Sequence, residues 1–339
     1  MKKILITGGA GYIGSHTAVA LVNAGFEPVI IDNFSNSDKS ALIGLKNILG
    51  RALTCYEGDC NDKLLMQKVF EENQFGGVIH FAAYKAVGES TQFPLKYYTN
   101  NIDSLIILLE TMAAFGVKDL VFSSSCTVYG QPEHLPVSEE TPRQEAESPY
   151  GNTKKICEDI LRDYIKSGVA SRIISLRYFN PVGAHASGEI GELPLGVPNN
   201  LVPFITQTGA GIREKLTVFG NDYDTPDGSC IRDYIHVMDL ADAHVKALAY
   251  LFGQKDNFYD LFNVGTGNGN TVLEVIKTFE KVSGISLNYQ IGPRRPGDIE
   301  KVWANTDKIN KALGWKAQYS LEDSLRDSWN WQKKLGERE

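Results

Sequence analysis

The 339-residue chain is poor in cysteine and histidine, and neither residue shows metal-binding spacing. Six histidines are scattered along it, and its five cysteines are Cys55, Cys60, Cys126, Cys157 and Cys230. Because none of these residues has the short paired spacing of a zinc site, we expect no bound metal. A chain this long buries a large core without a disulfide framework. Reduced thiols and a cytoplasmic location are therefore expected.

The sequence also lacks an apolar run of membrane-spanning length. Lys2 and Lys3 precede an apolar stretch, as in a signal peptide, but Thr7 and Gly8 end that stretch far short of the usual length. Acidic residues outnumber basic ones by 41 to 34, and the net charge of -7 opposes general nucleic-acid binding. We therefore expect a small-molecule partner, with no nucleic acid and no membrane.

Short apolar strands alternate with helical segments through the first half of the chain. The expected strands are 4–6, 29–31, 77–82, 120–123 and 172–177. The expected helices are 15–24, 104–115 and a segment that carries Tyr150. This alternation predicts the α/β class, with a Rossmann-type doubly wound parallel sheet covered by helices on both faces.

Beyond about Phe179 the composition changes, because proline and glycine become frequent. Such a composition predicts long loops and a smaller, loop-rich C-terminal domain for a substrate. We place the first domain at 1–178 and the second at 179–339. A strand-like run followed by a helical segment predicts that the chain crosses back to the first domain near 232–251.

Glycines follow the first expected strand and open the first helix, either as Gly8-x-x-Gly11-x-x-Gly14 or as Gly9-x-Gly11-x-x-Gly14. Both spacings let backbone amides at a helix N-terminus approach a pyrophosphate. Asp32 ends the second strand, where an acidic residue binds the adenosine ribose and repels a 2′-phosphate. The first domain is therefore expected to bind NAD rather than NADP.

Tyr150 and Lys154 stand four residues apart, so both lie on one face of a helix. A tyrosine with its ordinary pKa of roughly 10 is a poor base at neutral pH, and a neighbouring ammonium can stabilise its phenolate. The same spacing also occurs by chance in many solvent-exposed helices. The pair alone therefore leaves open a catalytic role and a solvated helix face.

Larger sets of residues resemble a known family over nearly the full length. The glycine turn, Asn100, Ser123 to Ser125, Tyr150 and Lys154 resemble the extended short-chain dehydrogenase/reductases. Longer strings resemble the UDP-hexose 4-epimerases within that family; they are 80–82, 85–90, 177–185, 198–201, 219–223, 232–237 and 294–298.

The resemblance implies three sets of site residues. The catalytic set is Tyr150, Lys154 and Ser125. Tightly bound, recycled NAD is held by Gly8, Gly11, Tyr12, Ile13, Gly14, Asp32, Asn33, Asp59, Cys60, Phe81, Ala82, Lys85, Asn100, Ser123, Tyr150, Lys154 and Phe179. The UDP-sugar is held by Ser125, Tyr150, Asn180, Asn200, Leu201, Phe219, Arg232, Tyr234, Arg295, Asp298 and Val302.

Simpler roles exist for some of these residues. Asp59 is also a common type of turn residue. Arg232 and Arg295 suit a diphosphate, because a guanidinium pairs with two oxygens at once. Surface or interdomain salt bridges are the alternative for both arginines.

The implied activity is reversible inversion at C4 of UDP-glucose and UDP-galactose through a transient 4-keto sugar. The alternatives are a sugar-nucleotide dehydratase or dehydrogenase, and a nonenzymatic NAD-sensing protein. Dehydratases of this family carry an acidic pair after the residue that matches Ser125, where this chain has Cys126 and Thr127. Elimination is therefore disfavoured, and Cys126 is expected to face the core. Sensors typically lose the tyrosine or the lysine, and both are present here.

Val302 matches a position that borders the hexose pocket in similar enzymes, where a small residue admits N-acetyl groups. UDP-N-acetylglucosamine and UDP-N-acetylgalactosamine are therefore expected as further substrates. The alternative is that Val302 only packs, with Tyr84 or Phe179 closing the space. Similar enzymes are commonly homodimers, which we expect here as well.

Overall fold

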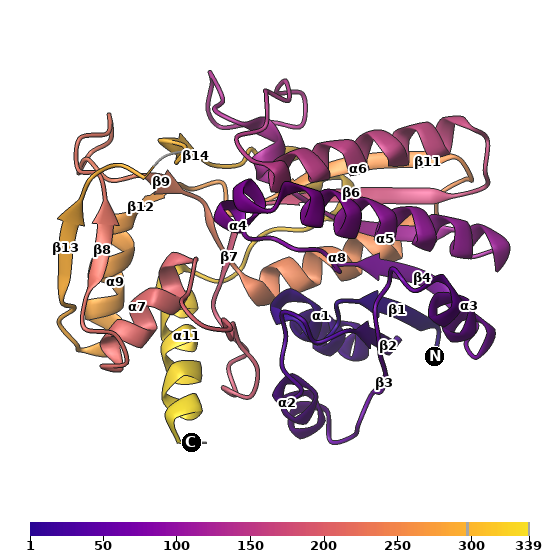
Figure 1. Cartoon of the computed structure of the whole chain (residues 1–339), viewed down its shortest axis with the longest axis horizontal. Coiled ribbons are helices and arrows are strands. Elements are labelled where there is room, and N and C mark those ends of the chain that lie inside the picture. Colours follow the sequence, from indigo (N-terminus) through magenta and orange to yellow (C-terminus); the bar gives the residue numbers. More distant parts are fainter. Residues whose placement is uncertain (296–297, 338–339) are drawn as a thin grey trace.

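A seven-stranded parallel sheet forms the centre of the larger lobe, on the right of Figure 1. The computed structural model describes residues 1–295 and 298–337, so Pro296 and Gly297 of the string 294–298 lie outside it. The order β11-β6-β5-β4-β1-β2-β3 confirms the predicted doubly wound sheet. Its strands are β1 (Lys3–Thr7), β2 (Glu27–Asp32), β3 (Thr54–Glu57), β4 (Phe75–His80), β5 (Asp119–Ser125), β6 (Arg172–Tyr178) and β11 (Phe258–Val264).

Helices cover both faces of the sheet, because alternate strand residues are apolar on each side. On β5, Val121 packs into one core cluster while Leu120 and Phe122 pack into the other. The first cluster includes residues of α1 (Tyr12–Asn23), α2 (Ser40–Leu49), α8 (Val237–Leu251) and α10 (Asp307–Leu313). The second includes residues of α3 (Lys63–Glu71), α5 (Pro94–Ala114) and α6 (Pro149–Lys166). No helix among the residues that the structure describes is both long and apolar enough to cross a membrane.

Strand β4 and helix α5 are two of the expected elements whose bounds differ in the structure. Strand β4 ends at His80 instead of residue 82. Helix α5 begins at Pro94, well before residue 104, because proline is favoured at the first position of a helix. The early part of α5 buries Tyr97 and Asn101 rather than a row of aliphatic residues. The aliphatic pattern therefore showed only the second half of this helix.

A second, smaller lobe has its own apolar core, built around Ile205, Val218, Phe279 and Leu325. It lies on the left of Figure 1 and contains α7 (Leu201–Gly209), β8 (Leu216–Phe219), α9 (Val272–Ser283), β13 (Tyr289–Gly292) and α11 (Leu321–Gly336). The proline- and glycine-rich stretch thus includes a helix and a strand beside its loops.

Short strands form two further small sheets: β7 (Asn180–Val182) pairs with β10 (Tyr234–His236), and β9 (Ile231–Arg232) pairs with β12 (Asn270–Thr271) and β14 (Lys301–Val302). After β10 the chain returns to the sheet as α8, and later as β11. Two more short elements complete the fold, α4 (Val87–Gln92) and the 3-10 helix η1 (Cys126–Tyr129).

Candidate active site

The glycine turn joins β1 to α1 at the carboxyl edge of the sheet. Gly8 has a φ of 68° and donates its N–H to the Ile31 carbonyl at 2.8 Å. A Cβ on Gly14 would lie 2.3 Å from the Gly8 oxygen, so only glycine fits there. The turn therefore brings bare backbone to the N-terminus of α1, which begins after Gly11. This cradle fits a pyrophosphate group.

Asp32 fixes the second part of this edge. It is 7% exposed, and its carboxylate accepts the N–H of Ala10 at 2.9 Å and of Phe34 at 2.9 Å. The Ser37 hydroxyl donates to it at 2.8 Å. A carboxylate has about four acceptor positions, so ribose hydroxyls can still bind.

A chain of amides continues from there towards α5. Asn33 donates to Asp59 at 2.8 Å, and Asn61 donates to Asp59 at 2.9 Å and to Asn100 at 3.2 Å. The Oδ1 atom of Asn61 is buried and has no hydrogen-bond partner among the described residues. Such an orphaned acceptor fits a donor group of a bound ligand. The sequence pointed to Asn33, Asp59 and Asn100, whereas Asn61 was missed.

Several other expected cofactor residues are engaged by the protein itself. The Tyr12 hydroxyl donates to the Gly183 carbonyl at 2.7 Å, and Ile13 packs against the first core cluster. The Phe81 ring lies 4.7 Å from that of His244. These contacts hold the side chains of Tyr12, Ile13 and Phe81 in place.

Three further expected cofactor residues are Cys60, Ala82 and Lys85. Cys60 is 3% exposed, and the backbone N–H of Ala82 donates to the Thr7 hydroxyl at 3.3 Å. Lys85 pairs with Glu192 at 3.5 Å. Lys85 therefore has a carboxylate partner in the second lobe.

The expected catalytic residues converge where β5 ends and α6 begins. Ser125 is the last residue of β5, and its hydroxyl accepts the Thr127 N–H at 3.2 Å. Tyr150 stands at the start of α6, and Lys154 follows on the next turn. Lys154 is 4% exposed, and its ammonium donates to the Ser123 carbonyl at 2.7 Å. The structure thus brings Ser123, Ser125, Tyr150 and Lys154 together.

Burial shifts both titratable groups of this cluster. It raises the pKa of Tyr150 to about 12, while a hydrogen bond with Ser125 lowers it. It lowers the pKa of Lys154 to about 8, against charge interactions with Cys157 and Glu158. Within the described residues no hydrogen bond joins the Tyr150 hydroxyl to Lys154. The Lys154 ammonium is instead held at the end of β5 by its hydrogen bond to the Ser123 carbonyl.

Tyr178 is a further residue of this cluster that the sequence did not reveal. It ends β6, and its hydroxyl makes a short hydrogen bond to the Ser123 hydroxyl. The two residues lie on neighbouring strands, so only the sheet register could have identified the contact.

Four of the expected substrate residues come together on the short strands. Val302 of β14 is the register partner of Arg232 on β9, and Asn180 of β7 is the register partner of Tyr234 on β10. One guanidinium nitrogen of Arg232 donates to the Ile231 carbonyl at 2.8 Å, which leaves other donors of this side chain available.

A second group of substrate residues lies at the end of β8. The Arg295 guanidinium lies 5.4 Å from the centre of the Phe219 ring, which is 40% exposed. Arg295 also pairs with both carboxylate oxygens of Asp298, at 3.1 and 2.7 Å. This ion pair is the alternative role that the sequence left open for Arg295.

Asn200 and Leu201 stand at the start of α7, where Asn200 donates to the Glu192 carboxylate at 2.6 Å. The same oxygen pairs with Lys85. Glu192 therefore connects an expected substrate residue to an expected cofactor residue, a connection that the sequence did not indicate.

Val302 lies in a small apolar cluster outside the two main core clusters. It is 2% exposed and belongs to this cluster with Phe179, Val128, Val137 and Ala304. The cluster places Val302 beside the expected cofactor residue Phe179 and leaves little of its side chain at the surface.

The whole chain resembles proteins of known activity. A family model described as GDP-mannose 4,6 dehydratase matches residues 5–328. The UDP-glucose 4-epimerase of Bacillus subtilis is 53% identical over 329 residues, which cover 97% of this chain and 96% of that protein. The chain belongs to the family that this model describes. Its identity to the Bacillus subtilis enzyme places it in the UDP-glucose 4-epimerase branch of that family. The predicted family is thereby confirmed.

Solved UDP-glucose 4-epimerases have the same fold over the full length. The enzyme from Bifidobacterium longum, in complex with NAD+ and UDP, is 46% identical with a TM-score of 0.95, and the match covers 99% of both chains. The enzyme from Stenotrophomonas maltophila, with NAD and formylated UDP-arabinopyranose, is 45% identical with a TM-score of 0.97 and full coverage of both chains.

Cys126 and Thr127, the two residues after Ser125, bear on the dehydratase alternative. Burial raises the pKa of the Cys126 thiol to about 12, so it holds its proton. The Thr127 hydroxyl is buried. Neither side chain is a suitable acid for the loss of water from a sugar.

Proposed function

We propose that this chain is an NAD-dependent enzyme that interconverts UDP-glucose and UDP-galactose by inverting C4 of the hexose. The observation that carries the proposal is the convergence of Ser125, Tyr150 and Lys154 in a chain 53% identical to a UDP-glucose 4-epimerase. Interconversion of these sugars would place the chain in galactose metabolism.

The residues near the glycine turn would hold the cofactor. Gly8, Gly11 and Gly14 leave space for the pyrophosphate, and Asp32 offers a fixed carboxylate to the ribose. Bound NAD would supply the hydride chemistry at C4, both its removal and its return. The negative Asp32 disfavours the 2′-phosphate of NADP.

The chain's own residues would move the proton. Tyr150 takes the proton of the 4-hydroxyl group, and Ser125 donates a hydrogen bond to the same oxygen. The positive charge of Lys154 favours the phenolate over the phenol. Once the 4-keto sugar has turned its other face towards the cofactor, Tyr150 gives the proton back to the oxygen at C4. The enzyme ends each cycle in the state in which it began.

The UDP portion would anchor the substrate while the hexose turns. Arg232 and Arg295 carry the positive charge for the diphosphate, and Phe219 and Tyr234 offer rings to the uracil side. Binding energy from this remote part holds the sugar near Tyr150 in both orientations.

Two finer features belong to the same proposal. The apolar Val302 leaves room for UDP-N-acetylglucosamine and UDP-N-acetylgalactosamine. We also propose a cytoplasmic location and a homodimer; the exposed apolar side chains Leu95 (77%) and Ile106 (39%) on α5 support the homodimer. These residues are three helical turns apart and lie on one face of α5.

The test is to give the purified protein UDP-galactose without added NAD and to identify the products. UDP-glucose with no accumulation of NADH is the expected result. A 4-keto-6-deoxy sugar would indicate a dehydratase, and NADH equal to the sugar consumed would indicate a dehydrogenase. Unchanged UDP-galactose would instead favour a sensor.

A further inference from the structure

A row of buried polar side chains crosses the sheet beneath α6. Ser124 of β5 is the register partner of Arg177 on β6, which is in turn the register partner of Asn263 on β11. Their side chains share one face of the sheet, and each is at most 2% exposed. Polar groups this deeply buried need hydrogen-bond partners.

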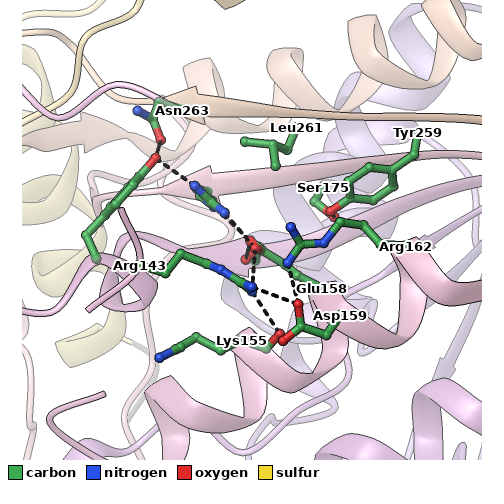
Figure 2. Close-up of polar contacts among 12 residues, drawn as sticks. Arg143, Lys155, Glu158, Asp159, Arg162, Ser175, Tyr259, Leu261 and Asn263 are labelled. Carbon is green, nitrogen blue, oxygen red and sulfur yellow. Dashed lines mark hydrogen bonds and ion pairs between the residues drawn. The ribbon is translucent and has the colours of Figure 1, made fainter. Parts of the chain in front are cut away.

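Glu158 of α6 ties this row to the helix. It is fully buried and accepts Arg177 Nε at 2.8 Å and Nη2 at 2.7 Å. The Ser124 hydroxyl donates to the same carboxylate at 2.6 Å, and Arg143 approaches it to 3.6 Å from the outside (Figure 2). Glu158 thus fastens α6 to both β5 and β6.

The row continues towards the mouth of the site. The remaining Arg177 nitrogen donates to the Tyr129 hydroxyl at 3.0 Å, and Tyr129 donates to Asn263 at 2.6 Å. Asn263 donates to the Val137 carbonyl at 3.0 Å. Tyr129 and Val137 belong to the apolar cluster of Val302. One network therefore spans from α6 to the expected hexose pocket.

This network lies next to the reacting groups without including them. Glu158 follows Lys154 by one helical turn and Tyr150 by two. Ser124 stands between Ser123 and Ser125 on β5. A small slide of α6 along the sheet would change the separation of Tyr150 from Ser125.

We propose that Glu158 is a positioning residue: through Ser124 and Arg177 it fixes α6 against β5 so that Tyr150 and Lys154 face Ser125 and Ser123. The inference rests on the proposed epimerase activity. A buried ion pair often adds no net stability over apolar residues of similar size. The pair at Glu158 therefore contributes precise placement more than free energy of folding.

Glu158 also adds a charge effect at Lys154. Lys154 faces Cys157 and Glu158 from its own helix and His80 from β4. Glu158 raises the pKa of Lys154 against the effect of burial. Loss of this negative charge should therefore move the apparent pKa of Lys154 in the pH–rate profile to lower pH.

Three variants test the inference by steady-state kinetics with UDP-galactose. Glu158→Gln removes the charge, and Ser124→Ala removes only the hydroxyl that ties β5 to the helix. Asp119→Asn is the control, because Asp119 forms a two-bond ion pair with Arg172 at the opposite ends of the same two strands.

We expect Glu158→Gln to lower kcat roughly tenfold to hundredfold with KM changed less than about threefold, as misplaced reacting groups would cause. The apparent pKa of Lys154 in the pH–rate profile of this variant should move to lower pH. Ser124→Ala should lower kcat by at least about fivefold at an unchanged KM. Asp119→Asn should lose thermal stability yet keep the kcat and pH profile of the wild type.

Two results would overturn the inference while leaving the epimerase proposal intact: wild-type kcat in Ser124→Ala, or losses in all three variants that merely follow their loss of stability. If Glu158→Gln fails to fold, Ser124→Ala decides, since it leaves no buried charge unpaired. An inactive wild-type protein would instead contradict the proposed function.

Discussion

Val302 is the residue on which the proposed substrate breadth depends. Its side chain is nearly enclosed by Phe179, Val128 and Ala304, and its strand partner is Arg232. A tyrosine at this position is too large for the enclosed space, so its ring would extend towards the expected hexose pocket.

Val302→Tyr should therefore depress kcat/KM for UDP-N-acetylgalactosamine at least about tenfold more than for UDP-galactose, because a clash with an acetyl group costs on the order of 1–3 kcal/mol. The measurement is kcat/KM for both sugars in wild type and variant. Equal losses on the two substrates would mean that Val302 only packs.

The sequence revealed the site residues only where spacing or family strings identified them. The Tyr150 and Lys154 spacing correctly placed both on one face of α6. That Lys154 donates to the Ser123 carbonyl could not be seen, because the contact depends on how α6 sits on β5. The pairing of Glu158 with Arg177 and Ser124 also depends on sheet register, which one sequence does not disclose.

At the scale of elements, the turn between β1 and α1 makes a strict demand on residue type. Gly14→Ala would place a Cβ 2.3 Å from the Gly8 oxygen and 2.7 Å from the Gly9 Cα, and these backbone atoms leave no room to adjust. We expect the variant to lose bound NAD and about 1–3 kcal/mol of stability. The measurements are NAD released on denaturation and the free energy of unfolding.

Gly88→Ala is the matched control for that prediction. Gly88 lies in helix α4, is exposed, and has nothing within 4 Å of an added Cβ. Alanine there should be neutral or stabilising by about 0.5–1 kcal/mol, with NAD retained. If Gly14→Ala behaved like Gly88→Ala, the turn would not be the pyrophosphate cradle.

The hydrophobic pattern predicted the buried strands β1, β2, β5 and β6, because each contains a run of consecutive apolar residues. It missed the first half of α5, whose buried residues include Tyr97 and Asn101. It also gave no sign of the two-residue strands β9 and β14, which are held in place by their partners rather than by their own composition.

At the scale of the whole molecule, the proposed homodimer depends on the exposed apolar face of α5. Leu95→Asp would place a charge on that face, and burial of an unpaired charge in an interface is costly. We expect light scattering to give twice the 37.4 kDa chain mass for the wild type and a shift towards the single mass for the variant.

Leu64→Asp on α3 is the control for the dimer, since Leu64 is just as exposed, at 78%, but lies on another helix. It should leave the mass unchanged. A single mass for the wild type, or equal effects of the two substitutions, would contradict an interface on α5.

The central claim is that the hydrogen removed from C4 returns to the same carbon, while only the hydroxyl proton passes through Tyr150. The most direct test uses UDP-galactose with deuterium at C4, converted in ordinary water and followed by mass spectrometry and NMR of the product. The account predicts UDP-glucose that retains the deuterium at C4. Loss of the label to the solvent would show that C4 is inverted by proton exchange, and would contradict the account.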